Sequence, residues 1–200
     1  MKLLFQKQTV TFEQTPIIEE VIEKINELLQ DQFYFSHLLA DGEEILEDPE
    51  QFLVKQLVNI DSLEVIAVAA KEFINDLLLS AEEYTERSVP QITELVDEFY
   101  NNPSGENWAD LSALFEGVQW LTTMIETVNQ SAVRPTNWDE VVTSSEALQT
   151  ELGNLEEALE NADTVLVADM LQYEILPVFE SFVIEFKTII DTEGTRHDLN

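Results

Sequence analysis

The chain has 200 residues, 44% of them apolar, which is enough to fold around a sizeable buried core. Its 41 acidic residues against nine lysines and arginines give a formal charge of −32, which argues against binding nucleic acid or an anionic membrane through the general electrostatic field. It has no cysteine, which excludes disulfides, thiolate metal sites and a cysteine nucleophile. The apolar stretch at residues 1–5 is too short for a signal peptide and no stretch reaches membrane-spanning length, so we expect a cytoplasmic protein.

About a third of the way along the chain, the hydrophobic pattern changes from the two-residue alternation of strands to the three- and four-residue spacing of helices. We therefore expect an α+β protein with a first domain over residues 1–70, an acidic helical domain over residues 71–192 and a polar C-terminal tail over residues 193–200. Residues 1–71 carry a net charge of −9 and residues 72–186 a net charge of −22. Most of the acidity therefore belongs to the helical domain.

The first domain alternates apolar and polar residues on both sides of one helical segment. Pro16 suits the first turn of that helix, and the apolar residues after it recur at helical spacing. The pattern predicts, in order, a hairpin over residues 2–13, a helix over residues 16–30, a strand over residues 33–39, a turn at Asp41-Gly42 and a last strand over residues 63–68.

This order of hairpin, helix, strand and closing strand resembles the ubiquitin-like β-grasp family. The resemblance covers about a third of the chain, and it implies a small domain that docks onto other proteins. Conjugated members of that family end in a flexible Gly-Gly tail. Here the last strand leads through Ala69-Ala70-Lys71 into a helix, so conjugation to a target is not implied.

The rest of the chain predicts helices joined by short loops. Apolar stripes run over residues 74–99, 111–128, 141–162 and 165–190, and Pro90 either kinks the first helix or starts a second one. Four or five antiparallel helices favour an all-α up-and-down bundle. The last helix is apolar around most of its circumference, which makes a homodimer possible if its neighbours leave part of it uncovered.

A short motif occurs twice in the helical domain, at residues 107–111 and again at residues 137–141. Each copy begins Asn-Trp and continues with an acid, which is typical of a helix start in which Asn is the N-cap. One interpretation is that Trp108 and Trp138 pack against the starts of their own helices. The other is that Trp108 and Trp138 form a pair of anchors for a protein partner.

Residues suited to catalysis or to metal binding are few. His37 and His197 are the only histidines, and each is more typical of a surface or structural position than of general acid–base catalysis. The acidic stretch over residues 41–50 could attract a cation, but it lacks the oxygen spacing of an EF-hand. The chain contains no phosphate-binding loop, dinucleotide fingerprint or Gly-x-Ser-x-Gly motif. We therefore expect no catalytic, cofactor-binding or metal-binding residues.

These observations favour a non-catalytic intracellular protein that binds another protein, as an adaptor or as a chaperone-like factor. Two alternatives remain open: an enzyme with an unrecognised carboxylate-based site, and an acidic nucleic-acid mimic that binds basic proteins. The acidity itself is also common among soluble bacterial proteins, in which it serves solubility. A partner would be held either by contact of its apolar surface with the tryptophans or by attraction of a basic protein to the acidic surface. Contact with the tryptophans gives more specificity than attraction of basic proteins in general.

Overall fold

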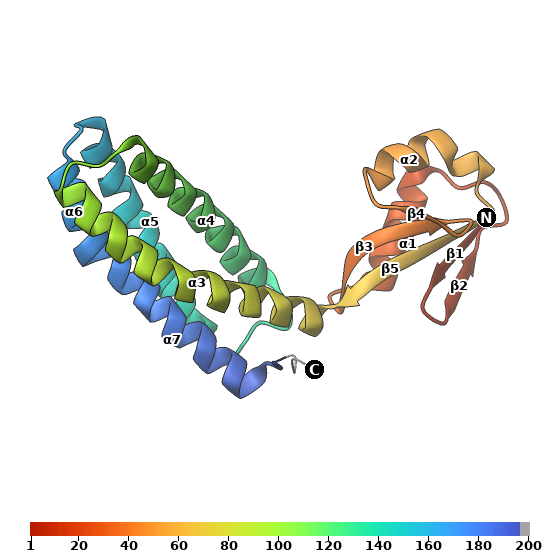
Figure 1. The fold of residues 1–200 in the computed structure, drawn as a ribbon. Helices are drawn as coiled ribbons and strands as arrows, with labels where there is room; N and C mark the ends of the chain where they lie inside the picture. The colour runs from red at the N-terminus through yellow and green to blue at the C-terminus, as the bar shows by residue number, and fades with distance from the viewer. Residues whose placement is uncertain (197–200) are drawn as a thin grey trace. The chain divides into compact units, whose positions relative to one another are not determined.

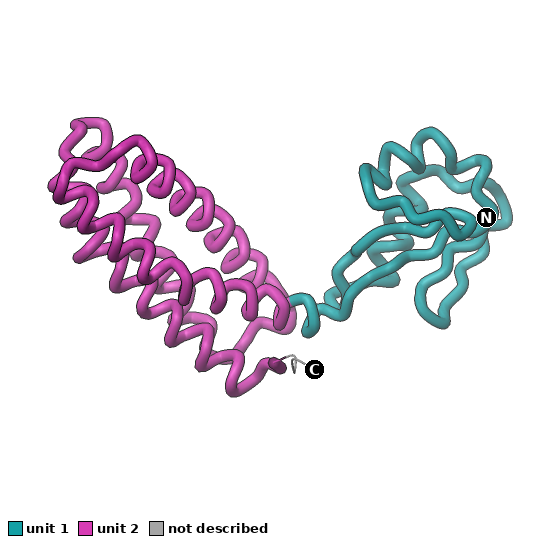
Figure 2. The backbone as a smooth tube through the Cα atoms, in the orientation of Figure 1, with its two compact units in different colours: residues 1–73 teal, residues 74–200 magenta. Residues whose placement is uncertain are grey.

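The chain folds as an α+β protein, which confirms the expected class. The structure is a computed structural model and describes residues 1–196 (Figure 1). The chain forms two compact units, Met1–Phe73 and the residues from Ile74 onward (Figure 2). The first unit contains the strands, and the second is helical.

The first unit is a five-stranded sheet with helices. The strands lie in the order β2-β1-β5-β3-β4, with β1 parallel to β5 and the other neighbours antiparallel. The predicted hairpin, first helix and two later strands all form, and the elements of the unit are β1 (Lys2–Phe5), β2 (Gln8–Thr11), α1 (Ile18–Leu29), β3 (Phe33–Ala40), β4 (Glu43–Ile45), α2 (Pro49–Gln56), the 3-10 turn η1 (Leu57–Asn59) and β5 (Ser62–Ala69).

The core of this unit lies between α1 and one face of the sheet. Alternate residues of the strands point toward the helix, so that Leu3 and Leu63 are fully buried. Val21 and Ile25 cover them from the buried side of α1. The carboxylate of Glu20 accepts a hydrogen bond from the N–H of Ile17 at 3.3 Å, which satisfies one free amide at the start of α1.

The second unit is built from long helices that lie side by side (Figure 1). Pro90 does not divide the first of them: α3 continues through it, because Pro90 is exposed and so is Glu86, whose carbonyl loses its amide donor. The helices are α3 (Ala70–Tyr100), α4 (Gly105–Gln130), α5 (Trp138–Glu160), α6 (Thr164–Met170), the π turn η2 (Leu171–Ile175) and α7 (Leu176–Glu193).

The predicted last helix, over residues 165–190, is not one regular α-helix. A single π turn, η2, separates α6 from α7, and it ends two residues before Pro177. Proline has no N–H to donate, so the series of α-helical hydrogen bonds is already interrupted near Pro177. The buried face of α7 then supplies Phe179, Phe182 and Phe186, each of them fully buried.

The residues assigned to a C-terminal tail are partly structured. Glu193 ends α7, and Arg196 donates hydrogen bonds to both carboxylate oxygens of Glu82 on α3, at 2.6 and 2.8 Å. Asn75 on α3 also exchanges two hydrogen bonds with the backbone of Thr195, at 2.7 and 2.9 Å. The start of the tail is therefore fixed to α3, while His197 lies outside the described residues.

We predict that Leu63→Ala lowers the free energy of unfolding of the first unit by about 2–5 kcal/mol, because it leaves a cavity between β5 and α1. Urea unfolding followed through backbone amide signals of residues 1–73 measures this unit separately. Val58→Ala is the matched control, since Val58 is 74% exposed and should change the result by less than about 0.5 kcal/mol. Equal effects of the two substitutions would contradict the assigned core.

A second prediction concerns Tyr100, at the end of α3. Its hydroxyl donates a hydrogen bond to the carboxylate of Asp169 on α6, and this bond raises the pKa of Tyr100 to about 12. The folded protein therefore holds this proton more tightly than the unfolded chain, so the contribution to stability is present below pH 10.0 and is lost as the pH rises through about 12.

Ultraviolet titration of the tyrosines tests this expectation. In Asp169→Asn, one tyrosine should ionise at a lower pH than it does in the original protein, and Glu174→Gln should leave the titration unchanged. Identical titration curves for the original protein and Asp169→Asn would refute the assignment.

Candidate functional site

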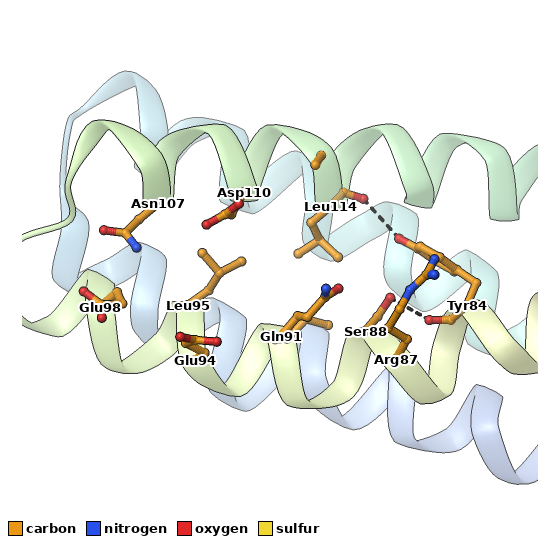
Figure 3. Close-up of a pocket in the computed structure, with 12 residues that line it drawn as sticks. Tyr84, Arg87, Ser88, Gln91, Glu94, Leu95, Glu98, Asn107, Asp110 and Leu114 are labelled. Carbon is orange, nitrogen blue, oxygen red and sulfur yellow. Dashed lines mark hydrogen bonds between the residues drawn. The ribbon is translucent and has the colours of Figure 1, made fainter.

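A groove of about 550 Å³ lies between α3 and α4 (Figure 3). The side chains that line it come from the second half of α3 and the first half of α4. Its apolar lining consists of Ile92, Leu95, Ala113 and Leu114. Ile92, Leu95 and Leu114 belong to the buried stripes of the two helices. The groove therefore lies at the outer edge of the packing between α3 and α4.

Carboxylates dominate the charge of the groove. Glu94 and Glu98 lie on α3 and Asp110 on α4, while Arg87 is the only cation among the lining residues that the structure describes. Gln91 and Asn107 add neutral polar groups (Figure 3). The groove therefore combines apolar surface with a net negative charge, which suits a ligand that is both apolar and basic.

Tyr84 closes one end of the groove. Its hydroxyl donates a hydrogen bond to the carbonyl of Leu114 at 3.5 Å (Figure 3), and burial raises the pKa of Tyr84 above its usual value. The ring lies directly over Gly117 on α4, where a Cβ would come within 2.0 Å of the hydroxyl oxygen. A glycine at position 117 therefore allows the two helices to meet here.

Two half-exposed tryptophans lie on α4, outside the lining of the groove. Trp108 follows the lining residue Asn107 and packs edge-on against Phe99, with ring centroids 4.8 Å apart. Trp120 packs edge-on against Tyr84 at 5.8 Å. Both indoles are 39% exposed, so each offers aromatic surface on α4.

Trp138 does not belong to this surface. It is fully buried at the start of α5 and faces Phe186 across 6.3 Å, and its indole N–H has no partner among the described residues. Trp138 is therefore a core residue and not a surface anchor. Trp120 was not among the residues predicted from the sequence to bind a partner. It lies outside the buried stripe that includes Val118 and Leu121, and an aromatic residue off such a stripe is the signal that marks it.

The two Asn-Trp motifs also differ in how they start their helices. The N-cap of α4 is Ser104, three residues before the predicted cap, and Asn107 completes a capping box from the N3 position. Asn137 is the N-cap of α5, but its side chain makes no capping hydrogen bond. The predicted N-cap position is therefore wrong for Asn107 and correct for Asn137, although the expected side-chain hydrogen bond is missing at Asn137.

The other residues singled out in the sequence, His37 and the acidic stretch over residues 41–50, make local hydrogen bonds. His37 lies on β3, where its Nδ1 is 3.0 Å from the hydroxyl of Ser36. In the acidic stretch over residues 41–50, the Asp41 carboxylate accepts from the N–H of Ser62 at 2.8 Å, and Asp48 caps α2. Within residues 1–196, no group of three or more His, Cys, Asp or Glu side chains is placed to hold a metal ion. No helix among the same residues is long and apolar enough to cross a membrane.

Comparison with known proteins identifies one family. The family described as domain of unknown function DUF8042 matches residues 76–185, which is more than half of the chain. The matched residues include the whole lining of the α3–α4 groove. No curated protein and no solved structure matches the chain.

The close approach of Tyr84 to Gly117 predicts that alanine at position 117 has the opposite effect on stability from the usual one. Alanine normally stabilises a helix interior relative to glycine, by about 0.5–1 kcal/mol. Gly117→Ala should instead lower the free energy of unfolding by about 1–3 kcal/mol, because the new methyl group forces Tyr84 to move. Gly153→Ala on α5 is the control: nothing lies within 4 Å of its Cβ, so it should be stabilising. Urea unfolding of both variants checks this, and stabilisation by Gly117→Ala would contradict the packing described for Tyr84.

Proposed function

The chain belongs to the DUF8042 family, and we propose that the α3–α4 groove, which lies within the matched residues, is where this protein binds another protein. In this proposal the chain is a non-catalytic adaptor or chaperone-like protein of the cytoplasm. The observation that carries the proposal is the combination of apolar lining and acidic side chains in this groove, and the half-exposed Trp108 and Trp120 add aromatic surface on the same helix, α4.

The groove suits one kind of ligand. An amphipathic segment would place apolar side chains against Leu95, Ala113 and Leu114, in the way that helices bind to grooves in other proteins. Lysine or arginine on its polar side would meet the rim carboxylates. A ligand that extends beyond the groove would add contact with Trp108 or Trp120 on α4, and tryptophan is enriched at the energetic centres of protein interfaces.

For the first unit we propose a ubiquitin-like β-grasp. The strand order β2-β1-β5-β3-β4, the parallel pairing of β1 with β5 and the packing of α1 on one face support this assignment. For the second unit we propose an up-and-down bundle, because its helices lie side by side and follow each other through short loops (Figure 1). A docking domain joined to a bundle with its own groove is consistent with an adaptor.

Affinity capture tests the proposed function. The full chain, a Trp108→Ala/Trp120→Ala variant and an Ala113→Glu variant are each used to capture proteins from a lysate of the source cell, followed by mass spectrometry. Both variants should reduce capture of the same partner by about tenfold, which corresponds to about 1.4 kcal/mol. Ile184→Ala is the control, because Ile184 is 67% exposed on α7 and does not line the groove. Ala113→Glu fills the groove without removing a packed side chain, so it separates loss of binding from loss of fold.

The dependence of capture on salt distinguishes how the partner is held. Burial of apolar surface is weakened little by salt and is strengthened by sulfate, whereas attraction between charges weakens as salt rises. We expect the partner to remain bound at about 0.5 M salt, where the Debye length is below about 8 Å. Release of strongly basic partners at that concentration, with no effect of the groove variants, would contradict binding in the groove. Sedimentation equilibrium on the same samples shows whether a homodimer forms instead.

A further inference from the structure

One edge of strand β3 is open over half of its length. β3 runs from Phe33 to Ala40, and β5 pairs with it along that whole range. On its other side, β4 pairs only with Leu38, Leu39 and Ala40. Within residues 1–196, no backbone hydrogen bond reaches the outer side of residues 33–37.

The register shows which backbone groups point away from the sheet. The carbonyl of Gln32 accepts a hydrogen bond from the N–H of Ala70 at 2.8 Å, so Gln32 faces the β5 side. Backbone groups alternate in direction along an antiparallel strand, and Phe33 and Phe35 therefore direct their N–H and C=O groups outward. A β-bulge follows between Phe35 and His37, where the pairing with β5 changes register.

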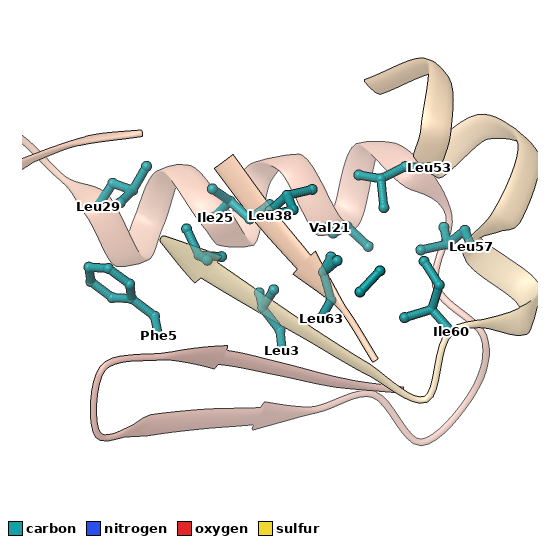
Figure 4. Packing of buried hydrophobic residues seen from close by; sticks show 12 residues of the cluster. Leu3, Phe5, Val21, Ile25, Leu29, Leu38, Leu53, Leu57, Ile60 and Leu63 are labelled. Carbon is teal, nitrogen blue, oxygen red and sulfur yellow. The ribbon is translucent and has the colours of Figure 1, made fainter. Parts of the chain in front are cut away.

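An apolar groove of about 260 Å³ lies beside this open edge. It is on the side of the sheet that α1 covers, and its walls come from Ile25 and Leu29 of α1, Leu53 of α2 and Leu38 of β3 (Figure 4). Phe35 also lines the groove and is 40% exposed, so part of its ring faces the groove and part is accessible to solvent. Unpaired backbone groups and an apolar groove therefore occur at the same place.

We propose that the open edge of β3 binds an extended peptide segment of another protein. The segment adds to the sheet as a strand beside residues 33–35 and occupies the position that β4 leaves free after Ile45. Side chains of a strand alternate between the two faces of the sheet, so every second residue of the peptide enters the groove lined by Phe35. The ligand is thus a segment with apolar residues two positions apart.

The charge around the edge defines the ligand further. Residues 1–73 carry 15 acidic and five basic residues, and exposed Glu47 and Glu50 lie in the segment that follows β4. Lysine or arginine on either side of the apolar residues would be attracted to this surface. A second copy of this chain would bring a second acidic surface to the same edge, and that repulsion favours a basic peptide over a homodimer.

The first test selects ligands without assuming their sequence. A phage-displayed library of short random peptides is selected on the full chain, and the recovered peptides are synthesised for titration. We expect alternating apolar residues with basic flanks, and binding about tenfold weaker to Phe35→Ala, or about 1.4 kcal/mol. Val58→Ala is the control, because Val58 is 74% exposed and lies outside the groove. Asn26→Trp, which fills the groove from its exposed rim, should also weaken binding and does not depend on removing Phe35.

The second test separates strand addition from ordinary apolar contact. Peptide binding should slow amide hydrogen exchange at Phe33 and Phe35, whose N–H groups would gain partners. Two peptides are N-methylated, each on one of the two alternate sets of nitrogens, which keeps the side chains and removes donors. Methylation of the set that faces β3 should abolish binding, and methylation of the other set should not. The proposal is wrong if no peptide is recovered, if Phe35→Ala and Asn26→Trp bind normally, or if both N-methylated peptides bind as well as the parent. Self-association that Phe35→Ala abolishes would assign the edge to a second copy and would also overturn it.

Discussion

Burial of aromatic side chains around α7 holds the helical unit together against the repulsion of its own carboxylates. Phe182 and Phe186 stack with ring centroids 5.6 Å apart, and Phe179 meets Phe182 edge-on at 6.3 Å. Full burial of each phenylalanine contributes roughly 1.5–3 kcal/mol. Most carboxylates stay on exposed faces, where salt screens their repulsion beyond about 8 Å. The interior is therefore mainly apolar, and most acidic residues lie on the surface, with buried Glu82 paired to Arg196 as an exception.

The groove between α3 and α4 follows from the same packing. The two helices meet where Tyr84 lies over Gly117, and again where Phe99 meets Trp108. Between these contacts the facing side chains include Ala113, which is too small to fill the space, and Glu94 and Asp110, whose charges favour solvent over the interior. The opening is thus bounded by rigid aromatic contacts and lies on regular helices. A partner would meet a surface that is already formed.

Hydrophobic periodicity was enough to predict the fold class and most elements, because buried stripes and alternating strands leave strong patterns in the sequence. It did not show α2, for which only Asp48 and Pro49 mark a helix start, since that helix buries little more than Leu53. The two Asn-Trp motifs looked equivalent because a capping motif depends only on residues that are close together in the sequence. Burial is decided by distant neighbours, and one neighbour of the buried Trp138 is Phe186, nearly fifty residues away. The groove and the open β3 edge depend on such distant contacts and could not be predicted from local pattern.

Fluorine NMR of the protein labelled with 5-fluorotryptophan tests binding at the α3–α4 groove most directly. The chain has three tryptophans: Trp108 follows the lining residue Asn107, Trp120 packs against the lining residue Tyr84, and Trp138 is buried in the core. Addition of the captured partner should shift the signals of Trp108 and Trp120 and leave the signal of Trp138 unchanged. If the partner binds while the signals of Trp108 and Trp120 stay in place, the groove is not its binding site.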